Sequence, residues 1–176
     1  MSDTAVDTGP AALTVRPALD TDAPGLMALI GACFAEYEGC VLETEHEMVH
    51  LLRPASHYAA AEGCAWVVEA EATVVASVAC RPAAGDGGIE LQMLYVAAAR
   101  RRRGLGARLV ELVEAEARRR TATFVDLWSD TRFLDAHRLY RSLGYEQLPG
   151  QRELDDLSAT VEYHFRKPLG PPSVTG

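Results

Sequence analysis

Residues 93–107 pass from an apolar strand pattern, through a basic turn, into a helix that opens with glycine. The turn and the helix start read Arg101-Arg102-Arg103-Gly104-Leu105-Gly106-Ala107, and leucine and valine then recur at helical spacing. The first N–H groups of a helix have no partner within it and carry a partial positive charge. Glycine there lets an anion approach the backbone, so the segment predicts an anion-binding cradle. The alternative is a solvated arginine run before an ordinary helix.

Two common phosphate-binding motifs do not fit this spacing. The chain has no Gly-x-x-x-x-Gly-Lys-[Ser/Thr] sequence, and the third glycine of the dinucleotide fingerprint is missing. The anion is therefore expected to belong to another class of ligand.

Hydrophobic periodicity predicts one mixed α/β domain with the element order β-α-α-β-β-β-α-β-α-β. Strands are expected at residues 13–16, 64–68, 73–80, 89–96, 123–127 and 161–165. Helices are expected from a cap at Asp20 or Thr21 to Phe34, and at residues 43–52, 105–120 and 131–143. Pro54 is expected to end the second helix. Residues 1–12 and 170–176 have the composition of tails, so a single domain is expected over residues 13–169.

Charge is divided unevenly along the chain. The protein has 17 basic and 25 acidic side chains, a net charge of −8. Residues 1–99 hold 3 basic and 14 acidic side chains, a net of −11, whereas residues 100–176 hold 14 basic and 11 acidic, a net of +3. The second part is expected to hold an anion. The acidic balance of the whole chain argues against nucleic acid or an anionic membrane as a partner.

Cysteine spacing and hydropathy set the expected compartment. The four cysteines form no Cys-x-x-Cys pair and lie near no histidine cluster, which argues against a zinc site or a disulfide framework. No apolar run approaches the roughly 20 residues of a membrane span. The first ten residues lack the apolar core of a secretion signal. We therefore expect a cytoplasmic protein without a metal.

The motif Arg101-x-x-Gly104-x-Gly106 resembles the pyrophosphate-binding sequence R/Q-x-x-G-x-G/A of the GNAT superfamily of acyl-CoA-dependent N-acetyltransferases. Farther along, residues 126–128 resemble the fifth strand of that family, and Ala136-x-x-Leu139-Tyr140-x-x-x-Gly144-Tyr145 resembles its next helix and the start of its sixth strand. The resemblance spans about residues 13–167. It implies a central mixed, mostly antiparallel sheet, with parallel splayed fourth and fifth strands and helices on both faces.

The resemblance also implies acetyl-CoA as co-substrate. The pantetheine arm would pair with the fourth strand, as an added strand would, and the pyrophosphate would lie on the amides that follow it. The expected cofactor-binding residues are Leu94, Tyr95, Val96, Arg101, Arg102, Arg103, Gly104, Leu105, Gly106 and Ala107. One departure stands out, because many relatives carry asparagine where this chain has Phe133. Asp130 or Ser129 are the alternatives for the missing contact.

Two residues are the expected catalytic groups. Tyr140 matches the position that points its hydroxyl at the thioester sulfur in the family; the alternative is a core tyrosine. Glu90, six residues before Val96, resembles the general base that removes the proton from the amine. Strand alternation places Glu90, Gln92, Leu94 and Val96 on one face. The alternatives are that Glu90 is an exposed strand residue, or that the base is Glu36, Glu38 or Glu43.

Glu36, Tyr37 and Glu38 lie where the family contacts its acceptor. The acceptor is expected to be a primary amine in a small molecule or peptide, and the acidity of residues 1–99 favours a cationic one. Direct attack in a ternary complex is expected, since no serine or cysteine is placed beside a histidine. The alternative is a non-catalytic acyl-CoA sensor. A homodimer is possible, as among relatives.

Overall fold

A seven-stranded mixed sheet forms the centre of the computed structural model, which describes residues 12–85 and 87–170. The strand order is β1-β2-β3-β4-β5-β7-β6. The strands are β1 (Thr14–Pro17), β2 (Cys64–Ala70), β3 (Thr73–Pro82), β4 (Gly88–Val96), β5 (Phe124–Asp130), β6 (Glu146–Glu153) and β7 (Val161–Pro168). Only β4 and β5 pair in parallel, which confirms the expected fold class. The tails lie outside the described residues, apart from residues 12 and 170.

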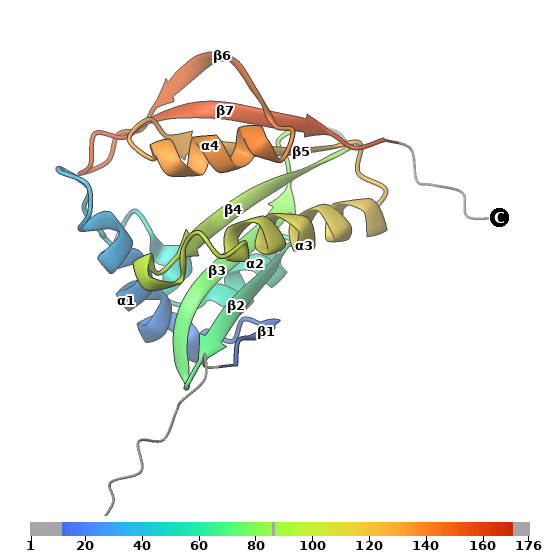
Figure 1. The fold of residues 1–176 in the computed structure, drawn as a ribbon. Coiled ribbons are helices and arrows are strands. Elements are labelled where there is room, and N and C mark those ends of the chain that lie inside the picture. Colours follow the sequence, from blue (N-terminus) through green and yellow to red (C-terminus); the bar gives the residue numbers. More distant parts are fainter. Residues whose placement is uncertain (1–11, 86, 171–176) are drawn as a thin grey trace, which may run out of the picture.

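Helices cover both faces of the sheet, as Figure 1 shows. They are α1 (Ala23–Phe34), α2 (Pro54–Ala60), α3 (Leu105–Arg119) and α4 (Leu134–Ser142). One buried core joins the sheet to α3 and to Tyr140 of α4, and a second joins it to α1 and α2. Among the described residues, no helix is both long and apolar enough to cross a membrane.

β4 and β5 separate halfway along their length. Their pairing runs from Gly88–Phe124 to Leu91–Leu127 and then stops, although both strands continue. The divergence is visible in Figure 1 between β4 and the group β5, β7 and α4. Residues 92–96 of β4 are therefore left without a strand neighbour on the β5 side.

A β-bulge at Met93 lies at this point and reverses the alternation of side chains. Met93 has a left-handed φ of +53°, and the pairing with β3 shifts between Ser77 and Ala79. Leu94 and Val96 pack in the core beneath α3, whereas Met93 packs beneath α1 and α2. The expectation that Leu94 and Val96 share a face with Glu90 is therefore wrong, because the bulge inserts an extra residue.

Two element predictions were also wrong. Residues 43–52 form turns and a 3₁₀ turn, η2 (Val49–Leu51), rather than a helix. Pro54 does not end a helix but begins α2, because the first helical position needs no backbone N–H. The periodicity also missed β6, whose side chains are almost all exposed, so no alternation marks it.

Candidate active site

A cavity of about 460 Å³ opens where β4 leaves β5. Its walls come from α1 and the segment after it, β4, the turn before α3, and the first turns of α3 and α4. The lining residues are Cys33, Tyr37, Leu94, Tyr95, Val96, Arg101, Arg102, Gly104, Leu105, Gly106, Ala107, Phe133, Asp135, Ala136, Arg138 and Leu139. Nine of the ten residues expected to contact the cofactor are among them; Arg103 is not.

The turn before α3 presents backbone amides that have no protein partner. Arg102 and Gly104 have φ values of +58° and +79°, and such left-handed residues turn successive N–H groups toward one concavity. In the described parts of the chain, no backbone carbonyl accepts a hydrogen bond from residues 102–107. A Cβ on Gly104 would meet no atom within 4 Å, so the space is open. The cradle thus fits a phosphate at a helix N-terminus.

Gly106 serves a different purpose. A Cβ at this position would lie 3.0 Å from Cδ2 of Leu139 on α4. The missing side chain therefore allows the first turn of α3 to approach α4 closely, and both helices line the cavity.

The consecutive arginines before α3 differ in whether a carboxylate binds them. Arg101 donates from Nε to the Val96 carbonyl at 2.8 Å, and its terminal nitrogens bind the Glu36 carboxylate at 2.6 and 2.7 Å. It therefore ties the segment after α1 to the end of β4. Arg102 and Arg103 are exposed and pair with no carboxylate of the described chain. Positive charge that is free to attract an anion lies with these two side chains.

Tyr140 lies beside the cavity rather than in its wall. The residue is 5% exposed and packs against Tyr145 and Phe165, with ring centroids 6.0 and 5.7 Å apart. Its neighbour Leu139 lines the cavity. Burial raises the pKa of the Tyr140 phenol, so the hydroxyl keeps its proton at neutral pH. The ring packs in the core, and its hydroxyl carries a proton.

Glu90 lies on the face of β4 that α1 and α2 cover. It is 8% exposed, which excludes the alternative of an exposed strand residue. Its carboxylate accepts hydrogen bonds from Arg81 at 3.3 and 3.4 Å and from Gln92 at 2.9 Å. Gln92 also accepts one from the Tyr58 hydroxyl at 3.1 Å. Hydrogen bonds that involve Arg81, Gln92 and Tyr58 thus hold the Glu90 carboxylate on this face of β4.

Of the three residues expected on the acceptor side, only Tyr37 lines the cavity. Glu36 is bound to Arg101, and the exposed Glu38 contributes its backbone carbonyl to Arg132. Phe133, which replaces the asparagine of relatives, packs against Tyr37 with ring centroids 4.8 Å apart. Two aromatic rings therefore form the cavity wall at this position.

Both alternatives for the missing asparagine already have protein partners. Asp130 binds Arg132 at 2.6 Å, and the Ser129 hydroxyl lies 3.2 Å from Nε2 of His137. Neither group is free to take over the contact in this arrangement.

Three polar residues of the wall, Cys33, Asp135 and Arg138, were not predicted from the sequence. Cys33 follows the apolar stripe of α1, and only the packing of α1 on the end of β4 shows that it faces the cavity. Asp135 stands directly before Ala136 of the recognised helix motif, so the motif itself could have indicated it.

The acids around the splay are paired with arginines. Nitrogen–oxygen distances are 3.3, 2.6, 2.5 and 2.6 Å for Arg81–Glu90, Arg132–Asp130, Arg152–Glu162 and Arg166–Asp126. Three of these four arginines come from residues 100–176, the part with a positive balance. All four pairs join groups of the same part of the chain, so they neutralise charge locally and leave the net balance of each part unchanged.

Within the described ranges, one group of three possible metal ligands occurs: Glu43, Glu45 and His46. The Glu43 carboxylate accepts backbone hydrogen bonds from Glu45, His46 and Glu47 at 2.7–2.9 Å. Its oxygens thus shape a turn of the backbone.

Comparison with solved structures shows the same fold. A ribosomal-protein-alanine N-acetyltransferase from Brucella melitensis is 21% identical, with a TM-score of 0.70 over 89% of this chain and 99% of its own. A GNAT-family acetyltransferase from Staphylococcus aureus Mu50 is 14% identical, with a TM-score of 0.76 over 90% and 100%. A Salmonella typhimurium protein, described as an acetyltransferase and solved with its cofactor acetyl-CoA, is 17% identical, with a TM-score of 0.70 over 94% and 98%.

A comparison with curated proteins found no match. Residues 27–145, more than half of the chain, match the acetyltransferase (GNAT) family. This range contains the splayed strands, the amide cradle and the helix that carries Tyr140. The chain therefore belongs to the GNAT family of acetyltransferases, whose typical co-substrate is acetyl-CoA.

Proposed function

We propose that this acetyltransferase transfers an acetyl group from acetyl-CoA to a primary amine by direct attack, with both substrates bound at once. The observation that carries the proposal is the cavity, which joins a cradle of free amides to the gap between β4 and β5. Acetyl-CoA supplies a thioester that is already activated toward amines. Residues 102–107 would bind its pyrophosphate, and the backbone along residues 94–96 would bind the pantetheine arm.

The cavity wall favours direct attack over a covalent route. Among the described residues that line the cavity, Cys33 is the one cysteine, and none is a histidine. Burial raises the pKa of the Cys33 thiol, which keeps it protonated and a poor nucleophile.

Tyr140 would donate its proton to the leaving sulfur. The raised pKa keeps this proton in place, and the position next to Leu139 puts the residue beside the cavity. Glu90 would accept the proton of the amine through a water molecule, since an alkylamine with a pKa near 10.4 arrives protonated. The hydrogen bonds from Arg81 and Gln92 would hold the carboxylate in place.

Thiol release from acetyl-CoA tests the proposal. We would measure it with spermidine, a lysine-rich peptide, glutamate and an acidic peptide, and expect turnover with at least one amine. In Glu90→Gln, kcat/KM should fall by about 100-fold, on the scale of general base catalysis. Glu114→Gln is the matched control, because Glu114 is also buried and paired but lies on α3 with Arg118 and Lys167.

A non-catalytic sensor gives a different result. It would bind acetyl-CoA and release no thiol with any amine, and this outcome would contradict the proposed reaction. Unchanged kcat/KM in Glu90→Gln would remove Glu90 from its role and leave the reaction itself standing.

A further inference from the structure

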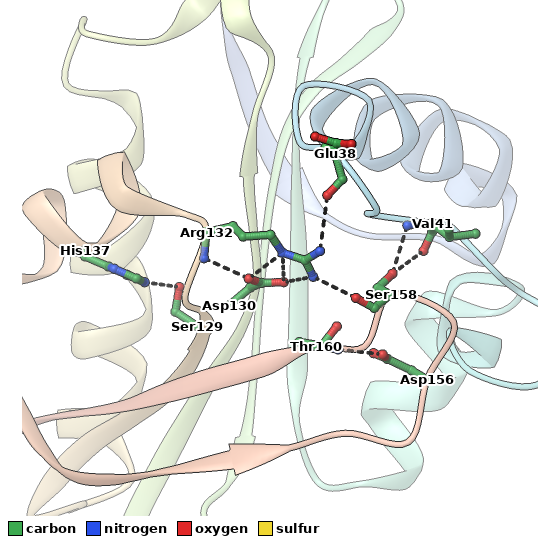
Figure 2. Close-up of polar contacts among 9 residues, drawn as sticks. All are labelled: Glu38, Val41, Ser129, Asp130, Arg132, His137, Asp156, Ser158 and Thr160. Carbon is green, nitrogen blue, oxygen red and sulfur yellow. Dashed lines mark hydrogen bonds and ion pairs between the residues drawn. The ribbon is translucent and has the colours of Figure 1, made fainter.

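Arg132 joins three segments that are far apart in the sequence. Its Nε and one terminal nitrogen bind the Asp130 carboxylate at 2.9 and 2.6 Å. The terminal nitrogens also donate to the carbonyls of Glu38 at 3.4 Å and Ser158 at 3.2 Å. Figure 2 shows the guanidinium between these groups. We call this set of contacts the Arg132 clamp.

Further hydrogen bonds join the same two outer segments, residues 35–48 and 154–160. The Ser158 hydroxyl accepts from the Val41 amide at 2.8 Å and donates to the Val41 carbonyl at 3.3 Å (Figure 2). The Leu157 amide donates to the Glu47 carboxylate at 2.8 Å. The segment after α1 is thus held to the β6–β7 connection, more than 100 residues later in the chain.

The clamp is coupled directly to the wall of the cavity. Phe133 follows Arg132 and lines the cavity, and it packs against Tyr37, the residue before Glu38. Phe133 also lies 6.1 Å from Phe34, which lies 5.9 Å from Tyr95 of β4, measured between ring centroids. Any shift of residues 35–48 would therefore move Tyr37 and loosen the aromatic wall.

The chemistry of the clamp requires arginine. Asp130 is 6% exposed and ends β5, so its charge needs a partner in place. A guanidinium presents five donors in a rigid plane and can bind a carboxylate and two carbonyls together, which an ammonium group cannot do in this geometry.

We propose that Arg132 is a positioning residue for the acceptor amine. It holds residues 35–48 and 154–160 against the end of β5 and so fixes the wall that the acceptor meets, while the amide cradle for acetyl-CoA lies on other elements. This inference rests on the proposed amine acetylation. Its consequence is a separation of effects, because loss of the clamp should weaken acceptor use and leave acetyl-CoA binding unchanged.

The test compares Arg132→Lys, which keeps a positive charge beside Asp130, with Ser158→Ala, which removes only the Val41 contacts. The acceptor probe is the amine with the highest turnover in the panel above. KM for this amine should rise about tenfold in Arg132→Lys, the scale of a lost hydrogen bond to a charged group, and about fivefold in Ser158→Ala, which loses hydrogen bonds between neutral groups. The acetyl-CoA dissociation constant should stay within about twofold, since no cradle contact is lost. Amide exchange should quicken in residues 35–48 and 154–160 together and stay unchanged in residues 102–107.

Arg152→Lys is the matched control. Arg152 also pairs with a shielded carboxylate, that of Glu162, but both lie in the β6–β7 hairpin and neither bonds residues 35–48. An unchanged acceptor KM in both clamp variants overturns the proposal. Equal losses for amine and acetyl-CoA that follow the melting temperature also overturn it, because they indicate a purely structural role. Absence of thiol release in the unmodified protein would instead contradict the proposed function.

Discussion

Arginine has different roles on the two sides of the gap between β4 and β5. Around the amide cradle, four arginines have no carboxylate partner among the described residues: Arg100, Arg102, Arg103 and Arg108. On the β5 side, each of three arginines binds a carboxylate at 2.5–2.6 Å: Arg132, Arg152 and Arg166. The first set leaves positive charge available to an anion, and the second uses its charge within the protein.

This difference separates binding from positioning. An unpaired surface charge adds to the attraction of a charged ligand and is weakened by salt. A partly buried, bidentate pair holds two elements at a set distance, and its removal leaves a carboxylate without compensation. Substitutions on the two sides should therefore give different kinetic signatures.

The largest effect is expected where the cradle is disturbed. Gly104→Val should raise the acetyl-CoA dissociation constant about 1000-fold, because a side chain at φ +79° would displace the amides and lose about two charge-assisted hydrogen bonds, worth ~4 kcal/mol. Titration calorimetry would measure it. Gly150→Val on β6 is the control, with φ +96° and the same open surroundings. Equal affinity in the two folded variants would place the cofactor elsewhere.

The next effect separates chemistry from binding on the cofactor side. Tyr140→Phe should lower kcat by about 10- to 1000-fold and leave acetyl-CoA affinity unchanged, because only a proton donor is removed. Tyr145→Phe is the control, since Tyr145 is a second buried tyrosine packed against the first. Steady-state kinetics would decide, and full activity in Tyr140→Phe would assign the proton to water or to another group.

A smaller effect tests the free arginines themselves. Arg102→Ala and Arg108→Ala should each weaken acetyl-CoA binding about fivefold, the scale of about 1 kcal/mol for one charge pair near the surface, and the loss should shrink as salt is added. Arg152→Ala, which removes a paired arginine on the other side, should leave this affinity unchanged. A loss that is equal for all three variants would abolish the distinction between the two sides.

The smallest effect concerns the charge of the acceptor. The net charge of −11 over residues 1–99 favours a cationic amine, but Glu36 and Glu90 are already paired with Arg101 and Arg81. We expect kcat/KM for spermidine to exceed that for glutamate by a few-fold at low salt, and the ratio to approach one at high salt. A ratio that does not change with salt would show that the shape of the pocket selects the amine.

The sequence by itself determined where the amide cradle lies. The cradle combines a helix N-terminus, two glycines and arginines without a carboxylate partner, all within residues 100–108. Local backbone geometry therefore sets their relative position. The apolar runs likewise predicted most of the strands, because a buried strand carries its pattern in a few adjacent residues. Even there, the bulge at Met93 was not predictable, since no sequence signal marks its left-handed backbone.

On the β5 side of the gap, only the tertiary structure decided which residues meet. Glu38, Arg132 and Ser158 meet although 94 and 26 positions separate them, and nothing local indicates that one guanidinium binds both carbonyls. The same holds for Glu36, which looked free along the chain and is bound to Arg101, 65 residues away. Charge counted along a sequence adds up contributions that folding then pairs, because Coulomb energy depends on distance in space and not on separation along the chain.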